Sequence, residues 1–333
     1  MYKLNVSDVV SLNHFLKLNV IEYIDIFLNK GESIMVSNTN ELFAYYSLKT
    51  DASVNNTGDV IRLPRKVLMN LVAEGYIAID VSEDVVELTF YDSTQGMDVE
   101  VCSVRLNSQL AFTATYEHKL ELIKKFSDYD KFHLEDFNLM CKIGRNTGSI
   151  ISINNGLASI SLSGNSKIFK EVPEDLYFGI SANTLGQMLS VSNTIYNVEN
   201  FLGVYSKNYL ILANKCRGDL NDDYKQIMEQ KSAFEFDIDL ASVKSFFNKM
   251  HPSEDTLEVD VEGSNCRFVD GSRKYSVPVK IKNIRKVPDK IGVVSFPAYL
   301  FKEVFSTTSV SEIKLCKKRF FTKLMIGDLI LVY

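Results

Sequence analysis

One pattern recurs along this chain and limits what the chain can fold into. Each copy begins with a short strand, continues with one amphipathic helix, and ends with alternating strands separated by Asn, Gly, Asp or Ser turns. The helices are expected at intervals of roughly 50 to 65 residues, which is long for a solenoid but suits a repeated α+β module. Their predicted starts lie near Ser7, Pro64, Glu117, Ser181, Leu240 and Pro297. The sequence therefore predicts six modules of one kind.

Local signals agree with this pattern at several helix ends. Pro64 is predicted at the first position of the second helix, where no hydrogen bond is lost, and Gly75 suits the end of that helix. Ser181 has the hydroxyl that an N-cap needs. In the third module, residues 115–127 are predicted as the helix and residues 137–144 as the strand that follows it.

Two modules together make one domain, so the six modules pair into three tandem domains. The expected fold is α+β, with each domain built from two β-α-β-β-β modules. The predicted domains are residues 1–107, 108–220 and 221–333. Neither join is rich in Gly and Ser, so we expect neighbouring domains to hold fixed relative positions.

Composition and charge narrow the function. No apolar run reaches the roughly 18 residues that a membrane helix needs, and the N-terminus lacks the basic and apolar regions of a signal peptide. We therefore expect a cytoplasmic protein. The net charge of −5 argues against a protein that coats nucleic acid with its whole surface. Any face that binds nucleic acid must be local.

No group of residues typical of catalysis or metal binding appears. The sequence has no phosphate-binding loop, no GxSxG elbow and no HExxH motif. The histidines stand apart from one another, and the cysteines occur singly without CxxC spacing. These residues are His14, His118, His133 and His251, and Cys102, Cys141, Cys216, Cys266 and Cys316. We therefore expect that the protein is not an enzyme and has no catalytic residue, metal or cofactor.

Two segments near the C-terminus carry a sharper signal than the repeat. In the first, a glycine is followed by an Asp-Tyr pair, a basic residue and an aliphatic residue: Gly218, Asp223, Tyr224, Lys225 and Ile227. In the second, residues 295–305 read SFPAYLFKEVF, and the chain then ends on the strand DLILVY. Together with the six modules, these segments resemble the bacterial beta sliding clamp, a DNA polymerase processivity factor.

The sequence departs from that family at three places. Asp222 stands where the family usually has Pro, and Gln226 stands where it often has a basic residue. The sequence stops at Tyr333, whereas the family continues with a Met-Pro-Met-like tail. Such departures are typical of a divergent member, and a phage source would account for them.

The resemblance implies a ring that tethers a replicative polymerase to DNA. Each chain would form half of the ring, and two chains would close head to tail as a homodimer around double-stranded DNA. DNA polymerase and clamp loader would bind through short apolar peptides between the second and third domains. The positions that match the family's peptide site are Tyr224, Ile227, Val332 and Tyr333.

In such rings the helices line the hole, so the resemblance also implies a set of residues that contact DNA. Basic side chains on the helix faces would bind phosphates without reading the base sequence. The basic residues chosen on the predicted helices are Lys17, Arg65, Lys66, Lys124, Lys125, Lys244, Lys249 and Lys302.

Two other functions remain open at this point. A monomeric, non-ring accessory subunit of a polymerase could use a related fold to bind DNA with one basic face, and self-association would separate it from a clamp. A structural or assembly protein could also be built from duplicated α+β domains. Failure to bind either DNA or polymerase would favour that alternative.

Overall fold

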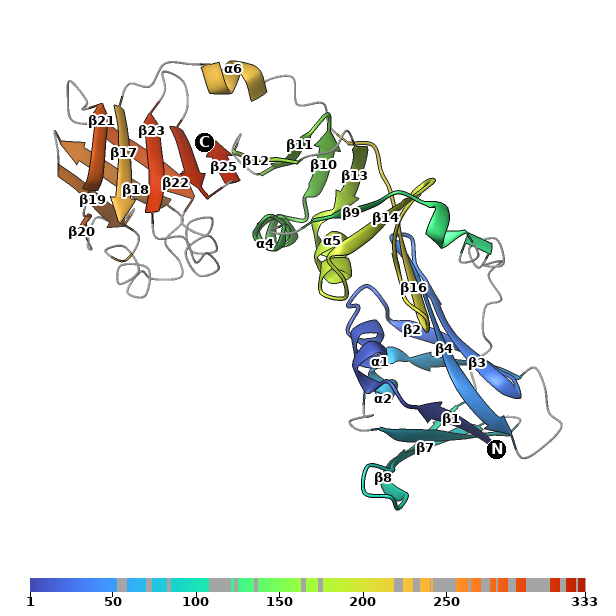
Figure 1. Ribbon diagram of the computed structural model, residues 1–333. Helices are drawn as coiled ribbons and strands as arrows, with labels where there is room; N and C mark the ends of the chain where they lie inside the picture. The colour runs from blue at the N-terminus through green and yellow to red at the C-terminus, as the bar shows by residue number, and fades with distance from the viewer. Residues whose placement is uncertain are drawn as a thin grey trace. The chain divides into compact units, whose positions relative to one another are not determined.

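The structure is a computed structural model in which two compact parts are resolved (Figure 1). The residues it describes are 1–52, 59–69, 74–82, 85–107, 121–122, 125–134, 137–162, 166–172, 176–218, 224–229, 234–239, 241, 256–262, 265–270, 276–279, 281–286, 292–297, 312–317, 322–327 and 329–332. Unit 1 consists of Met1–Glu135 and Thr184–Lys215, and unit 2 of Asp136–Asn183 and Cys216–Tyr333. Both combine short helices with antiparallel strands, so the expected α+β class is confirmed. The limits of three separate domains stay a prediction.

Unit 1 is built around one sheet. Its elements are β1 (Tyr2–Val6), α1 (Val9–Leu16), β2 (Tyr23–Leu28), β3 (Gly31–Asn38), β4 (Leu42–Ala52), β5 (Asp59–Pro64), α2 (Arg65–Leu68), β6 (Gly75–Val81), β7 (Val85–Asp92), β8 (Val99–Asn107), the 3-10 turn η1 (Phe126–Asp128), β9 (Lys131–His133), β14 (Thr194–Val198), β15 (Phe201–Tyr205) and β16 (Tyr209–Asn214). Within the described residues, twelve strands join this sheet. β4 pairs antiparallel with β16, with Tyr46 opposite Tyr209, so strands from distant parts of the chain form one surface.

The first helix begins close to its predicted start at Ser7. α1 begins at Val9, and Asp8 caps it, because its carboxylate accepts a hydrogen bond from the backbone N–H of Ser11 at 3.0 Å. The buried face of α1 consists of Leu12, Phe15 and Leu16. The second helix begins one residue later than predicted, because Pro64 ends β5 and is the N-cap of α2. The role predicted for Gly75 at the helix end is wrong, because Gly75 is the first residue of β6.

Unit 2 contains two sheets. Its elements are α4 (Asn138–Thr147), β10 (Ile150–Asn154), β11 (Leu157–Ser161), β12 (Lys167–Glu171), β13 (Tyr177–Ser181), α6 (Tyr224–Glu229), β17 (Phe234–Asp239), β18 (Thr256–Glu262), β19 (Asn265–Asp270), β20 (Ser276–Val279), β21 (Ile281–Lys286), β22 (Gly292–Pro297), β23 (Glu312–Lys317), β24 (Thr322–Ile326) and β25 (Leu329–Val332). In the described part of the chain, nine strands form one sheet and four form the other, in the order β20-β19-β18-β22. β25 lies beside β12 (Figure 1), with Val332 opposite Lys167, and pairs on its other side with β24.

The helix α5 (Ala182–Leu189) crosses the limit between the units and starts directly after Ser181, as predicted. The strand predicted over residues 137–144 is wrong, because this segment lies in α4. Its buried side chains recur at helical spacing, at Phe137, Met140 and Cys141. Gly144 continues this face.

Close packing explains why the helix holds a glycine there. A Cβ on Gly144 would lie 2.2 Å from Cδ1 of Ile160 and 2.6 Å from Cβ of Ala182. Only a residue without a side chain lets α4 approach the sheet and α5 so closely. Gly148 then ends α4 in the left-handed region, at φ 66°.

Three predicted helices fall wholly or partly outside the described residues. Of the helix predicted over residues 115–127, the structure describes residues 121–122, which are helical, and residues 125–127, where the 3-10 turn η1 (Phe126–Asp128) begins. The helix expected near Leu240 is described only at residue 241, and the helix expected near Pro297 only at Pro297, which is the last residue of β22. Within the described ranges, no helix is both long enough and apolar enough to cross a membrane.

Candidate functional site

An apolar cluster in unit 2 joins the helix α6 to the nine-stranded sheet. Its buried members are Leu157, Phe169, Ile227, Ile330 and Val332, and the partly buried side chains packed against them are Tyr224, Met228 and Met325. On α6, Tyr224, Ile227 and Met228 are three and four residues apart, which places them on one helix face. Ile227 is only 9% exposed. This helix therefore contributes an apolar face to the cluster.

Strand register places the other members of the cluster. Phe169 of β12 is opposite Ile330 of β25, and Val332 follows on the same face two residues later. Leu157 of β11 is opposite Glu171, which lies two residues beyond Phe169 on β12. The face that carries these apolar side chains therefore ends in a carboxylate.

Tyr224 connects the helix to that carboxylate. Its hydroxyl donates a hydrogen bond to Oε1 of Glu171 at 2.9 Å, and its ring lies 5.2 Å from the ring of Phe169. Burial and the neighbouring Glu171 raise the pKa of Tyr224 to about 12. The phenol therefore stays protonated at neutral pH and remains a hydrogen-bond donor.

A cavity of about 600 Å³ opens beside Tyr224. It is lined by Asn154, Asn155, Gly156, Leu157, Glu171, Val172, Tyr224 and Lys225. Asn155 and Gly156 form the turn between β10 and β11, and both have positive φ, 47° and 75°, which is typical of a two-residue hairpin turn. Apolar and polar groups thus meet in one hollow of a size that accepts small ligands or a few side chains. We call this cavity and the apolar cluster beside it the α6 groove.

Three of the four residues predicted for partner binding lie in the α6 groove: Tyr224, Ile227 and Val332. The fourth, Tyr333, lies outside the described residues. Val332 is also a strand residue, 5% exposed and paired with β12 and β24, so it supports the sheet as well as the groove. Sequence reasoning missed the contribution of β11 and β12. Apolar alternation indicated strands there, but no local signal says that α6 packs on them.

The predicted DNA-binding residues that the structure describes are all in unit 1. Lys17, Lys66 and Lys125 are exposed. Arg65 is half-buried, and its Nη1 donates a hydrogen bond to the backbone carbonyl of Leu16 at 2.7 Å. Arg65 therefore caps the end of α1 and holds α2 beside it (Figure 1). The other four, Lys124, Lys244, Lys249 and Lys302, lie outside the described residues.

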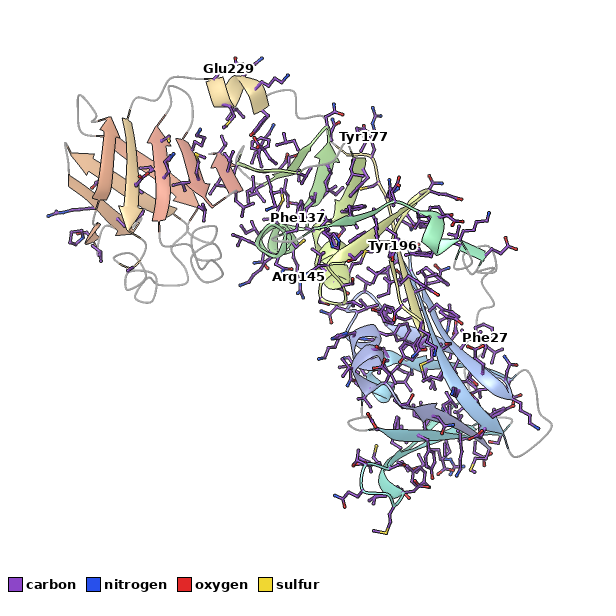
Figure 2. The ribbon with its side chains drawn as sticks, viewed as in Figure 1. Phe27, Phe137, Arg145, Tyr177, Tyr196 and Glu229 are labelled. Carbon is purple, nitrogen blue, oxygen red and sulfur yellow. The ribbon has the colours of Figure 1, made fainter. Side chains whose placement is uncertain are left out.

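Two further basic side chains lie on a helix that the sequence did not predict. Lys142 and Arg145 are exposed on α4, three residues apart on one face, and Figure 2 shows Arg145 on this helix. Because residues 137–144 were predicted as a strand, these two residues were not recognised as neighbours on one helix face. The helical spacing of the buried side chains in the same segment is the signal that could have found it.

Comparison with known proteins identifies the fold. No family model and no curated protein sequence matches this chain. A putative DNA polymerase III beta subunit from Eubacterium rectale is 13% identical, with a TM-score of 0.67 over 100% of this chain and 98% of its own. The subunit from Borrelia burgdorferi is 12% identical, with a TM-score of 0.69 over 100% and 98%. The Helicobacter pylori beta clamp bound to a DNA ligase peptide is 10% identical, with a TM-score of 0.60 over 100% and 99%. This chain has the fold of the bacterial beta sliding clamp.

The clamp fold extends over the full length of the chain, so both units belong to it. It confirms the resemblance that the repeated modules and the segment around Tyr224 predicted. At these identities the likeness is one of fold, and the function has to be argued from the sites. None of these proteins supports a phage source.

Proposed function

We propose that this chain is a DNA sliding clamp, which closes as a head-to-tail homodimer around duplex DNA in the cytoplasm. It tethers a replicative polymerase and catalyses no reaction. The observation that carries the proposal is the fold likeness over 100% of this chain and 98% of the Eubacterium rectale beta subunit. Coverage of the full length matters because each chain would form half of the ring, and it needs all of its domains to do so.

The basic helix residues support a role for DNA. The chain has a net charge of −5, yet it carries exposed cationic side chains on α2 and α4 and at the end of α1. These are Lys17, Lys66, Lys142 and Arg145. Lysine and arginine bind DNA phosphates regardless of the base sequence. Such contacts therefore hold the protein on DNA but let it slide along the duplex.

The α6 groove supports a role for a partner peptide. A groove of this kind binds by burying a few apolar anchors, each contributing on the order of 1 to 3 kcal/mol. The apolar cluster under α6 and the cavity beside Tyr224 provide such a place. The Helicobacter pylori clamp was solved with a DNA ligase peptide, and we propose that polymerase and clamp-loader peptides bind this chain in the α6 groove.

The sheet edges support assembly into a ring. β8 is one edge strand of the sheet in unit 1, and β20 is one edge strand of the four-stranded sheet in unit 2. Exposed edge strands pair readily with another chain. If β8 of one chain pairs with β20 of the next, the two identical contacts of a dimer close a ring.

A topological experiment tests the proposal. We expect the protein, loaded with its clamp loader, to stay on nicked circular DNA through a gel-filtration column and to be lost when the DNA is cut once. A ring held by topology slides off a free end, whereas a protein held by direct contacts does not. Equal retention on circular and linear DNA would favour the monomeric accessory subunit, and no binding to either would favour the structural protein.

The basic pair on α4 gives a second prediction. We expect Lys142→Ser with Arg145→Ser to weaken binding to DNA and to lower the slope of log affinity against log salt by about 0.9 for each lost phosphate contact. Lys30→Ser with Lys207→Ser makes the same charge change in exposed strand turns and should leave both quantities unchanged. An unchanged slope in the α4 variant would exclude this pair from the DNA-binding surface.

A further inference from the structure

One carboxylate lines the α6 groove beside its apolar side chains. Glu171 ends β12 and is exposed, and its Oε1 accepts the hydroxyl proton of Tyr224 in a 2.9 Å hydrogen bond. Within the described part of the chain, no lysine or arginine forms an ion pair with Glu171. The same cavity is lined by the apolar Leu157 and Val172, by Lys225, and by residues 154–156 at the β10–β11 turn.

This geometry leaves Glu171 able to accept more hydrogen bonds. An ionised carboxylate has about four acceptor sites, and Tyr224 occupies one of them. Tyr224 already holds the Glu171 side chain in place. Binding of a ligand to this carboxylate therefore costs little conformational entropy of the Glu171 side chain. A cationic donor forms a shorter and stronger bond to a carboxylate than a neutral donor does.

We propose that Glu171 makes the α6 groove selective for partner peptides that carry a lysine or arginine beside their apolar anchors. This inference rests on the proposed function, in which the groove binds such peptides. The anchors would pack against the apolar part of the lining, and the cation would bond to the free side of the Glu171 carboxylate. An acidic side chain in the same place would meet a like charge at short range, and its binding is correspondingly weaker.

Lys225 also lines the cavity, and its charge has the opposite sign. Lys225 is an exposed ammonium at the end of a long side chain, whereas Glu171 accepts a hydrogen bond from Tyr224. Both groups are exposed, but a charge whose side chain must first be ordered contributes less to an ion pair than one that is already held. The fixed carboxylate therefore decides the preference.

Labelled synthetic peptides test this selectivity on the full-length protein. Each octapeptide has the same Leu and Phe anchors and differs only in one residue, Lys, Gln or Glu, placed before the anchors in one set and after them in a second set. Fluorescence anisotropy then gives the dissociation constants. We expect the Lys peptide of one set to bind about tenfold more tightly than its Glu counterpart, with the Gln peptide between them. Added salt should reduce this ratio.

Two variants locate the source of the preference. Glu171→Gln keeps the shape of the side chain and should bring the three peptides to similar affinities. Glu229→Gln removes the same charge from the end of α6 (Figure 2). Glu229 is exposed and does not line the cavity, so this variant should keep the preference. Melting temperatures check that both variants are folded.

Each result has a definite meaning. A preference for Lys that depends on Glu171 and not on Glu229 supports the inference. If the three peptides bind equally to the unaltered protein, or if the preference survives Glu171→Gln, Glu171 does not select among peptides. The proposal that the groove binds peptides is then unaffected. If none of the peptides binds, the proposed peptide groove fails and the inference fails with it.

Discussion

Ile227→Asp is expected to abolish binding of apolar-anchor peptides and stimulation of the polymerase, with a loss of affinity of at least about a hundredfold. Ile227 is 9% exposed and packs between α6 and the sheet in the apolar cluster. An aspartate there removes apolar surface and places a carboxylate inside the apolar cluster, which makes this part of the groove polar and strongly hydrated. Anisotropy with the Gln octapeptide and a primer-extension assay measure the two losses.

The control for this variant is Ile227→Val, which keeps the apolar face and should retain most of the affinity. Truncation at Val332 is a poorer test, because this residue is paired with both β12 and β24 and its loss weakens the sheet. The molar mass and the melting temperature establish that Ile227→Asp is folded and assembled. Unaltered peptide binding by such a folded variant would place the partner site elsewhere on the chain.

Val99→Lys with Val101→Lys is expected to convert the dimer into monomers and to remove retention on circular DNA. Both valines lie on the edge strand β8, where they are 52% and 46% exposed, and Met97 beside them is 70% exposed. Apolar side chains on a free edge favour pairing with another strand, and lysines on an edge oppose it. Light scattering at several concentrations should show twice the chain mass of 37.8 kDa for the unaltered protein and the single mass for the variant.

A matched substitution separates the edge from the general effect of a new charge. Val10 is 67% exposed on α1, so Val10→Lys replaces an apolar surface residue outside the edge and should leave the dimer intact. A variant with both β8 lysines that still dimerises would exclude β8 from the interface. An unaltered protein that stays monomeric at tens of micromolar would favour the monomeric accessory subunit.

Several features of the fold could be predicted because their causes are local. Pro64 and Ser181 stand directly before α2 and α5, since proline suits a helix start and serine caps one. The alternation of buried and less buried residues in β1 follows from the pleat of a strand with two unlike faces. Neither prediction needs any knowledge of what the element packs against.

The error at α4 shows where local patterns stop being sufficient. The run from Phe137 to Gly144 is short and apolar, and its aromatic and branched residues also suit a strand. Tertiary packing supports the helix, because Gly144 lets α4 lie closely against Ile160 and Ala182. Both of those neighbours are distant in sequence.

The sequence by itself determined the α+β class, the repeated module and the resemblance that pointed to Tyr224 and Ile227, because periodicity and short motifs are properties of neighbouring residues. Only the tertiary structure placed Phe169 and Glu171 beside them. That placement depends on the pairing of β12 with the C-terminal strand β25. Many strands of similar composition could pair, and the choice among them depends on which arrangement buries the most apolar surface over the whole fold.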